Sequence, residues 1–327
     1  MGLRIQSVTA GAVAVGLLCG PVVSARRQDV TLQYRWTKGE AIRYRIAQVS
    51  ATTISGLPGG MGDMTIDQST TQVLRTVAEE IAPDGTATIR QVVESIKMDM
   101  SSPMFTTSFD SANPDGAAAN PMSGMLKTVL MPMVGASFTL VMAPSGEVKK
   151  VEGLSALAEK VFTSASQDPA AAGVLDGLKA NLSDEAMRSM LAQTFAQFPN
   201  RPLKPGDTWE GEVSASNPML GTLVTRVSST LKSVEGDGSS RVARIATSLT
   251  IKQDASKPVP PNPMGMTMQM GDATGDGEQF FDAVSGRFQR STIKVTMPMT
   301  MSGTGPDGTP LNLKTSVKTT TTVDIVQ

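Results

Sequence analysis

Apolar and polar residues alternate with a period of two along much of the chain after residue 30. That alternation is typical of a strand with one buried face and one solvated face. It recurs in pairs around turn residues rich in glycine and proline, which predicts hairpins at about 30–46, 64–100, 223–251 and 293–325. The predicted turns are Lys38-Gly39-Glu40, Pro83-Asp84-Gly85, Glu235-Gly236-Asp237-Gly238 and Pro306-Asp307-Gly308. Val92-Val93 interrupt the alternation of the second hairpin as a β-bulge would, and bulges bend strands.

The apolar spacing changes to that of a helix in the middle of the chain. Asn120 followed by Pro121 is typical of a helix N-cap and first turn, and helical stripes follow over about 122–133, 154–162 and 187–198. Helices inserted between groups of strands favour an α+β class over a parallel α/β fold. We therefore expect a predominantly β chain of the α+β class. Its curved antiparallel sheet or half-open barrel would carry a central helical insert, about 121–198, on the concave face.

The first 25 residues resemble an export signal. Arg4 precedes a short apolar run from Val8 to Leu18, and Val23-Ser24-Ala25 is a small-residue cleavage site. We expect residues 1–25 to be a signal peptide and 26–327 a single β-rich domain of a secreted or periplasmic protein. A lipid anchor at Cys19 is less favoured, because Leu18 occupies the position where that cleavage signal requires a small residue. No later segment is long and uncharged enough for a membrane-spanning helix.

Composition removes most familiar enzyme chemistry. The chain has no histidine and one cysteine, so the usual general base, thiolate nucleophile and commonest metal ligands are missing. Charge is balanced, with 29 Lys and Arg against 30 Asp and Glu, and no basic run suggests a nucleic-acid partner. We expect a protein that is not an enzyme and carries no cofactor.

Two short segments fit the serine-lysine signature of acyl enzymes. They begin at Ser229 and Ser291, with Lys232 and Lys294 three positions later. Both segments alternate as strands do, and an offset of three places the serine and lysine on opposite faces of a strand. This argues against catalysis at either.

Methionine is the unusual residue, with 21 copies. One explanation is core filling, since its flexible thioether suits irregular packing. Another is a deformable wall for an apolar, lipid-like or peptide ligand or a protein partner between sheet and insert. The residues predicted for that wall are Met122, Met125 and Met133 from the first helix and Met297, Met299 and Met301 from a strand.

A soft-metal site is the alternative. Met264, Met266, Met268 and Met270 are spaced by two, and thioethers bind soft ions such as Cu(I) or Ag(I). A purely structural envelope component without a small ligand is the third possibility.

Two turn motifs carry a resemblance. Lys38-Gly39-Glu40 near the start of the β-rich region is paired with a later Pro205-Gly206-Asp207-x-Trp209 segment. The chain resembles a family of uncharacterised secreted bacterial proteins, a domain of unknown function, with this pair of motifs. The resemblance implies no activity. More loosely, the expected fold is similar to open-barrel carriers of lipoproteins and lipids in bacterial envelopes. Residues 204–207 also predict a type II turn, with Trp209 packed at the end of the sheet.

Overall fold

The computed structural model describes residues 29–58, 62–116, 121–154, 159, 163, 197–217, 220–257, 267–304 and 310–326. The predicted signal peptide, 1–25, and Cys19 lie outside these residues. The elements are β1 (Ala41–Ser55), β2 (Met64–Ile81), β3 (Ala87–Ser101), β4 (Thr106–Asp110), α1 (Pro121–Leu130), the 3-10 helix η2 (Met131–Met133), β5 (Ser137–Met142), β6 (Val148–Glu152), β7 (Thr208–Asn217), β8 (Gly221–Glu235), β9 (Val242–Gln253), β10 (Thr267–Met270), β11 (Ala273–Asp282), β12 (Arg287–Thr304) and β13 (Pro310–Val326). No helix among the described residues is long and apolar enough to cross a membrane.

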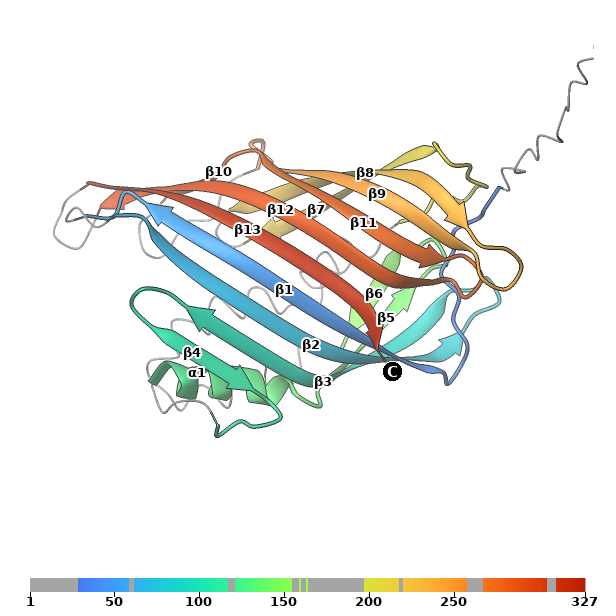
Figure 1. The fold of residues 1–327 in the computed structure, drawn as a ribbon, viewed down its shortest axis with the longest axis horizontal. Coiled ribbons are helices and arrows are strands. Elements are labelled where there is room, and N and C mark those ends of the chain that lie inside the picture. Colours follow the sequence, from blue (N-terminus) through green and yellow to red (C-terminus); the bar gives the residue numbers. More distant parts are fainter. Residues whose placement is uncertain are drawn as a thin grey trace, which may run out of the picture.

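The strands form one antiparallel sheet that does not close. Its order is β6-β5-β3-β2-β1-β13-β12-β11-β9-β8-β7, with β4 added to β3 and β10 added to β12. Long central strands cross the front of the molecule diagonally, and β5, β6 and β7, at the two ends of the sheet order, lie behind them (Figure 1). The predicted curved antiparallel sheet with a helical insert is confirmed.

Three of the four predicted hairpins are confirmed as strand pairs: β2–β3, β8–β9 and β12–β13. The turn predicted at 306–308 lies outside the described residues. The expected bulge is also present, displaced by one or two residues, because Val73 pairs with Ser95 while Leu74 pairs with Val93. Glu94 is therefore the extra residue.

The first predicted hairpin is wrong. Residues 29–37 form no strand beside β1, which pairs instead with β2 and β13. Their alternation has another cause, because Val30, Leu32 and Tyr34 are buried under one end of the sheet. We call residues 29–37 the strap.

The predicted helical insert begins as expected, because α1 starts at Pro121. It is not helical throughout, since β5 and β6 lie inside the predicted range. Alternating Phe138, Leu140 and Met142, all buried, pair β5 with the start of β3. Most residues of the two further predicted helices, 154–162 and 187–198, lie outside the described part of the chain.

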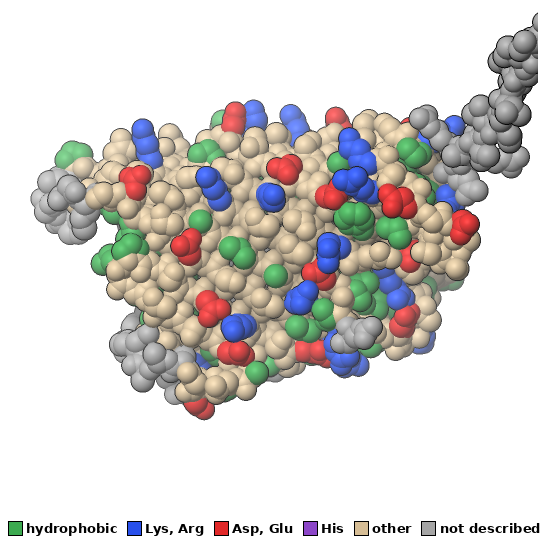
Figure 2. Space-filling view, viewed as in Figure 1, with side chains coloured by type: hydrophobic (Ala, Val, Ile, Leu, Met, Phe, Trp, Pro, Cys, Tyr) green, Lys and Arg blue, Asp and Glu red, His purple; other side chains and the backbone are tan. Residues whose placement is uncertain are grey.

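The two faces of the sheet differ in chemistry. Residues opposite one another in an antiparallel ladder share a face, so the strand registers assign each paired residue to one of the two faces of the sheet. We call the inner face the one that carries Leu140 on β5, Ile245 on β9 and Phe281 on β11, and the other the outer face. Ion pairs between strands lie on the outer face: Arg45–Asp324–Arg290, Arg226–Glu212 and Arg244–Glu278 join neighbouring strands, and Arg43–Glu94 reaches from β1 across β2 to β3. Figure 2 shows acidic and basic side chains scattered over the side turned to the viewer, without a large patch of either sign.

The main core lies at one end of the inner face, beneath the strap. The strap pairs through Val30 with Leu203, with N–O distances of 2.9 and 2.8 Å. Tyr34 N donates to Pro144 O (2.8 Å) and Arg35 N to Gly286 O (3.2 Å). The strap thus joins the turn after β5, the turn after β11 and the segment before β7. Tyr34, Phe198, Phe281 and Phe288 form the aromatic centre of this core.

A smaller core lies under α1. Leu126 and Leu130 of the helix pack against Val93, Ile96 and Phe109, which are buried on the inner face of β3 and β4. The helix therefore covers the same face as the strap, as expected for an insert on the concave side.

Candidate functional site: the methionine-lined inner face

Strand register brings five methionines onto one stretch of the inner face. Met297, Met299 and Met301 alternate along β12, and β10 adds to that strand with Met270 opposite Met299 and Met268 opposite Met301. Directly opposed side chains lie about 4.5–5.5 Å apart at Cβ. All five side chains are half-buried. We call Met268, Met270, Met297, Met299 and Met301 the methionine patch.

The patch unites two sets of residues that the sequence presented as alternatives. The methionines predicted for the ligand wall on β12 lie beside Met268 and Met270, which belong to the set predicted to bind a soft metal. The other two residues of that set, Met264 and Met266, lie outside the described residues. The sequence spacing showed that each set shares a face. It could not show that the two faces are the same, because that depends on pairing between strands almost 30 residues apart.

Apolar residues continue the wall on the neighbouring strand. Met297 faces Val317 of β13, and Met301 faces Leu313. Further across the sheet, Met64, Met98 and Met100 also fall on the inner face of β2 and β3. Sequence reasoning did not assign these three to a site, although the spacing of Met98 and Met100 by two was a usable signal.

The helical methionines lie elsewhere on the face. Met133 follows α1 and packs against both cores, and Met122 and Met125 are half-buried on the helix. The helix lies near β4, whereas β12 is four strands from β3. At about 4.8 Å per strand this is about 19 Å along the sheet. The two predicted walls thus share one face without adjoining.

No charged side chain occupies an inner-face position in the ladders of the described strands. The polar residues there are uncharged. Those that are buried on the strands are Thr70, Thr76, Gln91, Thr107, Thr225, Ser229, Thr247, Gln279 and Ser291. Several pair with one another: Gln91 Nε2 donates to Thr76 (3.4 Å), and the Ser229 and Thr247 hydroxyls are 3.4 Å apart. An apolar or neutral polar group could therefore lie against the inner face of these strands without contacting a charged side chain.

Neither serine-lysine segment forms a catalytic pair. Ser291 is buried on the inner face of β12, and Lys294 lies on the outer face opposite Asp276. Ser229 is likewise buried on the inner face, and Lys232 is exposed at a register shift. Among the described residues no group of three or more His, Cys, Asp or Glu could hold a metal ion.

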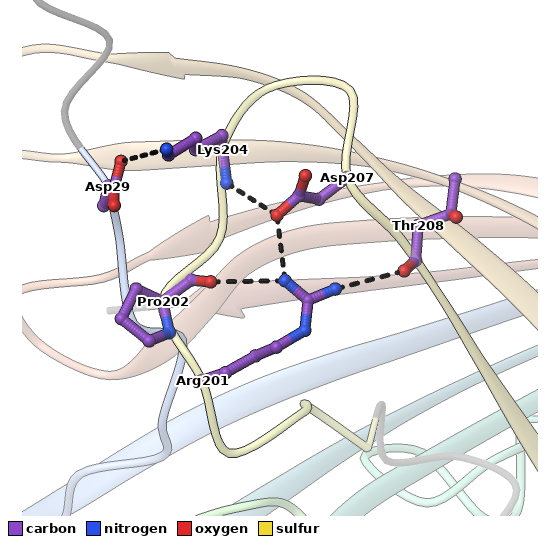
Figure 3. A network of polar contacts seen from close by, with 6 residues as sticks. All are labelled: Asp29, Arg201, Pro202, Lys204, Asp207 and Thr208. Carbon is purple, nitrogen blue, oxygen red and sulfur yellow. Dashed lines mark hydrogen bonds and ion pairs between the residues drawn. The ribbon is translucent and has the colours of Figure 1, made fainter.

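The turn at 204–207 has the predicted type II form. Gly206 has φ of +100°, and Asp207 N donates to Lys204 O at 2.9 Å. Asp207 Oδ2 accepts hydrogen bonds from Lys204 N (3.1 Å) and Arg201 Nη1 (2.9 Å), and these bonds lower the pKa of Asp207. Figure 3 shows Arg201 also reaching the carbonyl oxygens of Pro202 and Thr208. The motif therefore anchors the start of β7, and Trp209 packs against Phe198 at the end of the sheet.

The Lys38-Gly39-Glu40 turn is built in the same way. Gly39 has φ of +80°, and Glu40 N donates to Thr37 O at 3.1 Å. Both Glu40 carboxylate oxygens bond to Arg287, and chiefly this bond lowers the pKa of Glu40. The two motifs of the resemblance are thus structural anchors at the starts of β1 and β7.

Two hollows lie on the outer face. One of about 430 Å³ is lined by residues that include Glu210, Glu212 and Arg226, and one of about 260 Å³ by residues that include Pro298, Met299, Thr300 and Lys314. Both linings mix apolar residues with charged and hydroxyl-bearing ones, unlike the predicted apolar wall, and Met299 is the wall residue that reaches the smaller hollow.

Comparisons with known proteins give weak structural likenesses. No curated protein sequence matches the chain. A structure of lipovitellin, described by its lipid–protein interactions, is 7% identical with a TM-score of 0.45 over 90% of this chain. The chain spans only 26% of that lipovitellin chain. DynF from the dynemicin biosynthesis pathway of Micromonospora chersina is 9% identical with a TM-score of 0.20, over 95% of this chain and 92% of that one.

A family model matches residues 84–286, which is more than half of the chain. The match includes the Pro205-Gly206-Asp207-x-Trp209 segment and ends before β12. It confirms the predicted membership of an uncharacterised family: the chain belongs to DUF6263, a family of unknown function.

Proposed function

We propose that this protein is an exported, non-catalytic envelope protein that binds an apolar ligand on the inner face of its open sheet. The methionine patch on an uncharged face carries the proposal. Thioether side chains repack around variable apolar shapes, and an apolar ligand there would not strip water from a charge.

Export is supported by the first 25 residues and by cysteine usage. The apolar run ends before Val23-Ser24-Ala25, and the single cysteine, Cys19, precedes that site. The chain after cleavage would contain no thiol, so an oxidising compartment would not alter it through disulfide exchange.

A second candidate function uses the same residues. Met270 opposite Met299 and Met268 opposite Met301 place four thioethers on neighbouring strands. Thioethers select soft monovalent ions, so this arrangement supports binding of Cu(I) or Ag(I).

Substitutions at Met299 separate the two functions. Met299→Gln puts an amide where an apolar side chain stood, whereas Met299→Leu keeps apolar volume and removes the sulfur. We expect Met299→Gln to weaken binding of the fluorescent probe N-phenylnaphthylamine roughly tenfold, equivalent to about 1.4 kcal/mol, and Met299→Leu to change it less than about twofold. Thr296→Gln, exposed on the outer face of the same strand, is the control.

Fluorescence titration and native mass spectrometry measure these effects on the same samples. Co-purified mass that organic solvent removes, together with the expected ranking of variants, supports the carrier. Equal probe binding by the Gln and Leu variants contradicts it. Ag(I) retained by the native chain and lost from both variants supports the metal site instead. A bare chain that binds neither probe nor Ag(I) contradicts both functions and favours a structural role or a protein partner.

A further inference from the structure

The side chain of Gln279, on the inner face, has a buried oxygen that finds no hydrogen-bond donor among the described residues. Gln279 lies on β11 between Ile245 of β9 and Ser291 of β12, and only 4% of the residue is exposed. Its side-chain carbonyl oxygen, Oε1, is buried and accepts no hydrogen bond in the described structure.

Several other buried polar residues of the inner face, on strands nearer and farther from β11, do have a partner. Gln91 donates to Thr76, Thr107 bonds to Ser123 of α1, and the hydroxyls of Ser229 and Thr247 are within bonding distance of each other. Buried acceptors in folded proteins are almost always bonded, and one without a donor is costly. Gln279 Oε1 is therefore suited to a donor that comes from outside the described chain.

A row of apolar side chains on one face of β12 connects the neighbour of Gln279 with the methionine patch. Ser291 stands opposite Gln279, and from there the inner face of β12 continues through Ile293 and Val295 to Met297. Six residues of strand span about 20 Å, which is the scale of a long alkyl chain. Neither end of this path carries a charged inner-face residue.

We propose that the ligand is a neutral amphiphile. Its hydrogen-bond-donating head, a hydroxyl or amide, bonds to Gln279 Oε1, and its apolar tail runs along β12 to the methionine patch. The assignment rests on the proposed carrier function and adds the class of head group. A carboxylate head is disfavoured because it would bring a charge to a buried acceptor, and the described strands carry no cation on the same face.

Three probes with one tail test the head group: hexadecanol, which donates a hydrogen bond, methyl palmitate, which cannot, and palmitate, which is charged. Displacement of N-phenylnaphthylamine at neutral pH measures each affinity. Hexadecanol is expected to bind about tenfold more tightly than methyl palmitate, as one buried hydrogen bond implies, and palmitate to bind most weakly.

Gln279→Leu removes the acceptor and keeps a similar volume. Hexadecanol should then bind no better than methyl palmitate, while the affinity for methyl palmitate stays within about twofold. Gln72→Leu, on the inner face of β2, is the matched control and should keep the preference for hexadecanol. Thermal unfolding of both variants checks that they fold. Should the leucine variant not fold, Gln279→Ser removes the same side-chain carbonyl and keeps a polar group at this position.

The outcomes separate the two proposals. If no probe of the three binds and N-phenylnaphthylamine does not bind either, the carrier function is wrong. If all three bind alike, or if Gln279→Leu lowers all three affinities equally, the carrier function stands and the neutral-donor assignment is overturned.

Discussion

Asp324 lies between two arginines on the outer face, contributed by both neighbouring strands. Its carboxylate accepts from Arg290 Nε on β12 (2.8 Å) and Arg45 Nη2 on β1 (3.2 Å), with the side chain 14% exposed. The bond from Arg290, and then that from Arg45, lowers the pKa of Asp324 in the folded chain.

The lowered pKa predicts acid sensitivity with a definite sign. Because the folded pKa lies below the unfolded value, the stabilisation is complete above the unfolded pKa of about 4 and is lost as pH falls through the folded pKa. Thermal unfolding should therefore shift to lower temperature below about pH 4. Asp324→Asn should lose stability at neutral pH and show a shallower acid decline than the native chain. A parallel decline in both proteins would contradict this role.

Residue types and their spacing located only part of the candidate site. The absence of histidine directed attention away from acid–base catalysis, and methionine spacing located half of the patch. Gln279 gave no signal in the sequence, because a glutamine in an alternating strand has no distinguishing spacing. Its lack of a partner follows from neighbours on β9 and β12.

At the scale of elements, β11 shows how glycine permits close strand packing. A Cβ at Gly277 would lie 2.7 Å from Thr292 O and 3.0 Å from a side-chain carbon of Ile293. At Gly275 it would lie 2.5 Å from Lys294 O. Both obstacles are backbone atoms of β12, which cannot move without disturbing the ladder.

Gly277→Ala should therefore destabilise the fold by roughly 1–3 kcal/mol, the usual cost of overpacking. Gly211→Ala on β7 is the control, because an added Cβ there meets nothing within 4 Å. It should be neutral or slightly stabilising, since glycine weakens strand interiors. Urea unfolding of both variants measures the difference, and equal stabilities would show that β12 adapts to the added methyl.

The sequence predicted strand hairpins correctly where turn residues and apolar alternation agreed. The hairpin β2–β3 follows from its Asp84-Gly85 turn and β8–β9 from its glycines. The strap has the same alternation and forms no strand, because its buried side chains pack across the end of the sheet. Local periodicity indicates which side chains are buried. It does not indicate whether the segment pairs as a strand or packs against a core without pairing.

At the scale of the molecule, the strap holds an open sheet together at one end. Edge strands β6 and β7 do not pair with each other, but the strap bonds to Pro144 beyond β5 and to Leu203 before β7. Leu32 is fully buried between them in the main core.

Leu32→Ala should cost about 2–5 kcal/mol of unfolding free energy, as for other large core truncations. Lys38→Ala, exposed just beyond the strap, should change stability by no more than about 0.5 kcal/mol. Hydrogen exchange should show the loss of protection concentrated in β5–β7, the elements nearest the strap's contacts. Uniform loss over the sheet, or none, would contradict the strap's role in joining the edges.

The sequence by itself determined the strand-rich class, most hairpins, the start of α1, the alternation that places Met297, Met299 and Met301 on one face, and membership of an uncharacterised family. These properties are local, since each depends on residues within one strand, one turn or one motif. Only the tertiary structure decided that β10 pairs with β12, that the strap crosses the inner face, and that Gln279 Oε1 is buried without a donor among the described residues. Those depend on contacts between segments far apart in the chain, and period-two alternation contains no information about which strand becomes the neighbour.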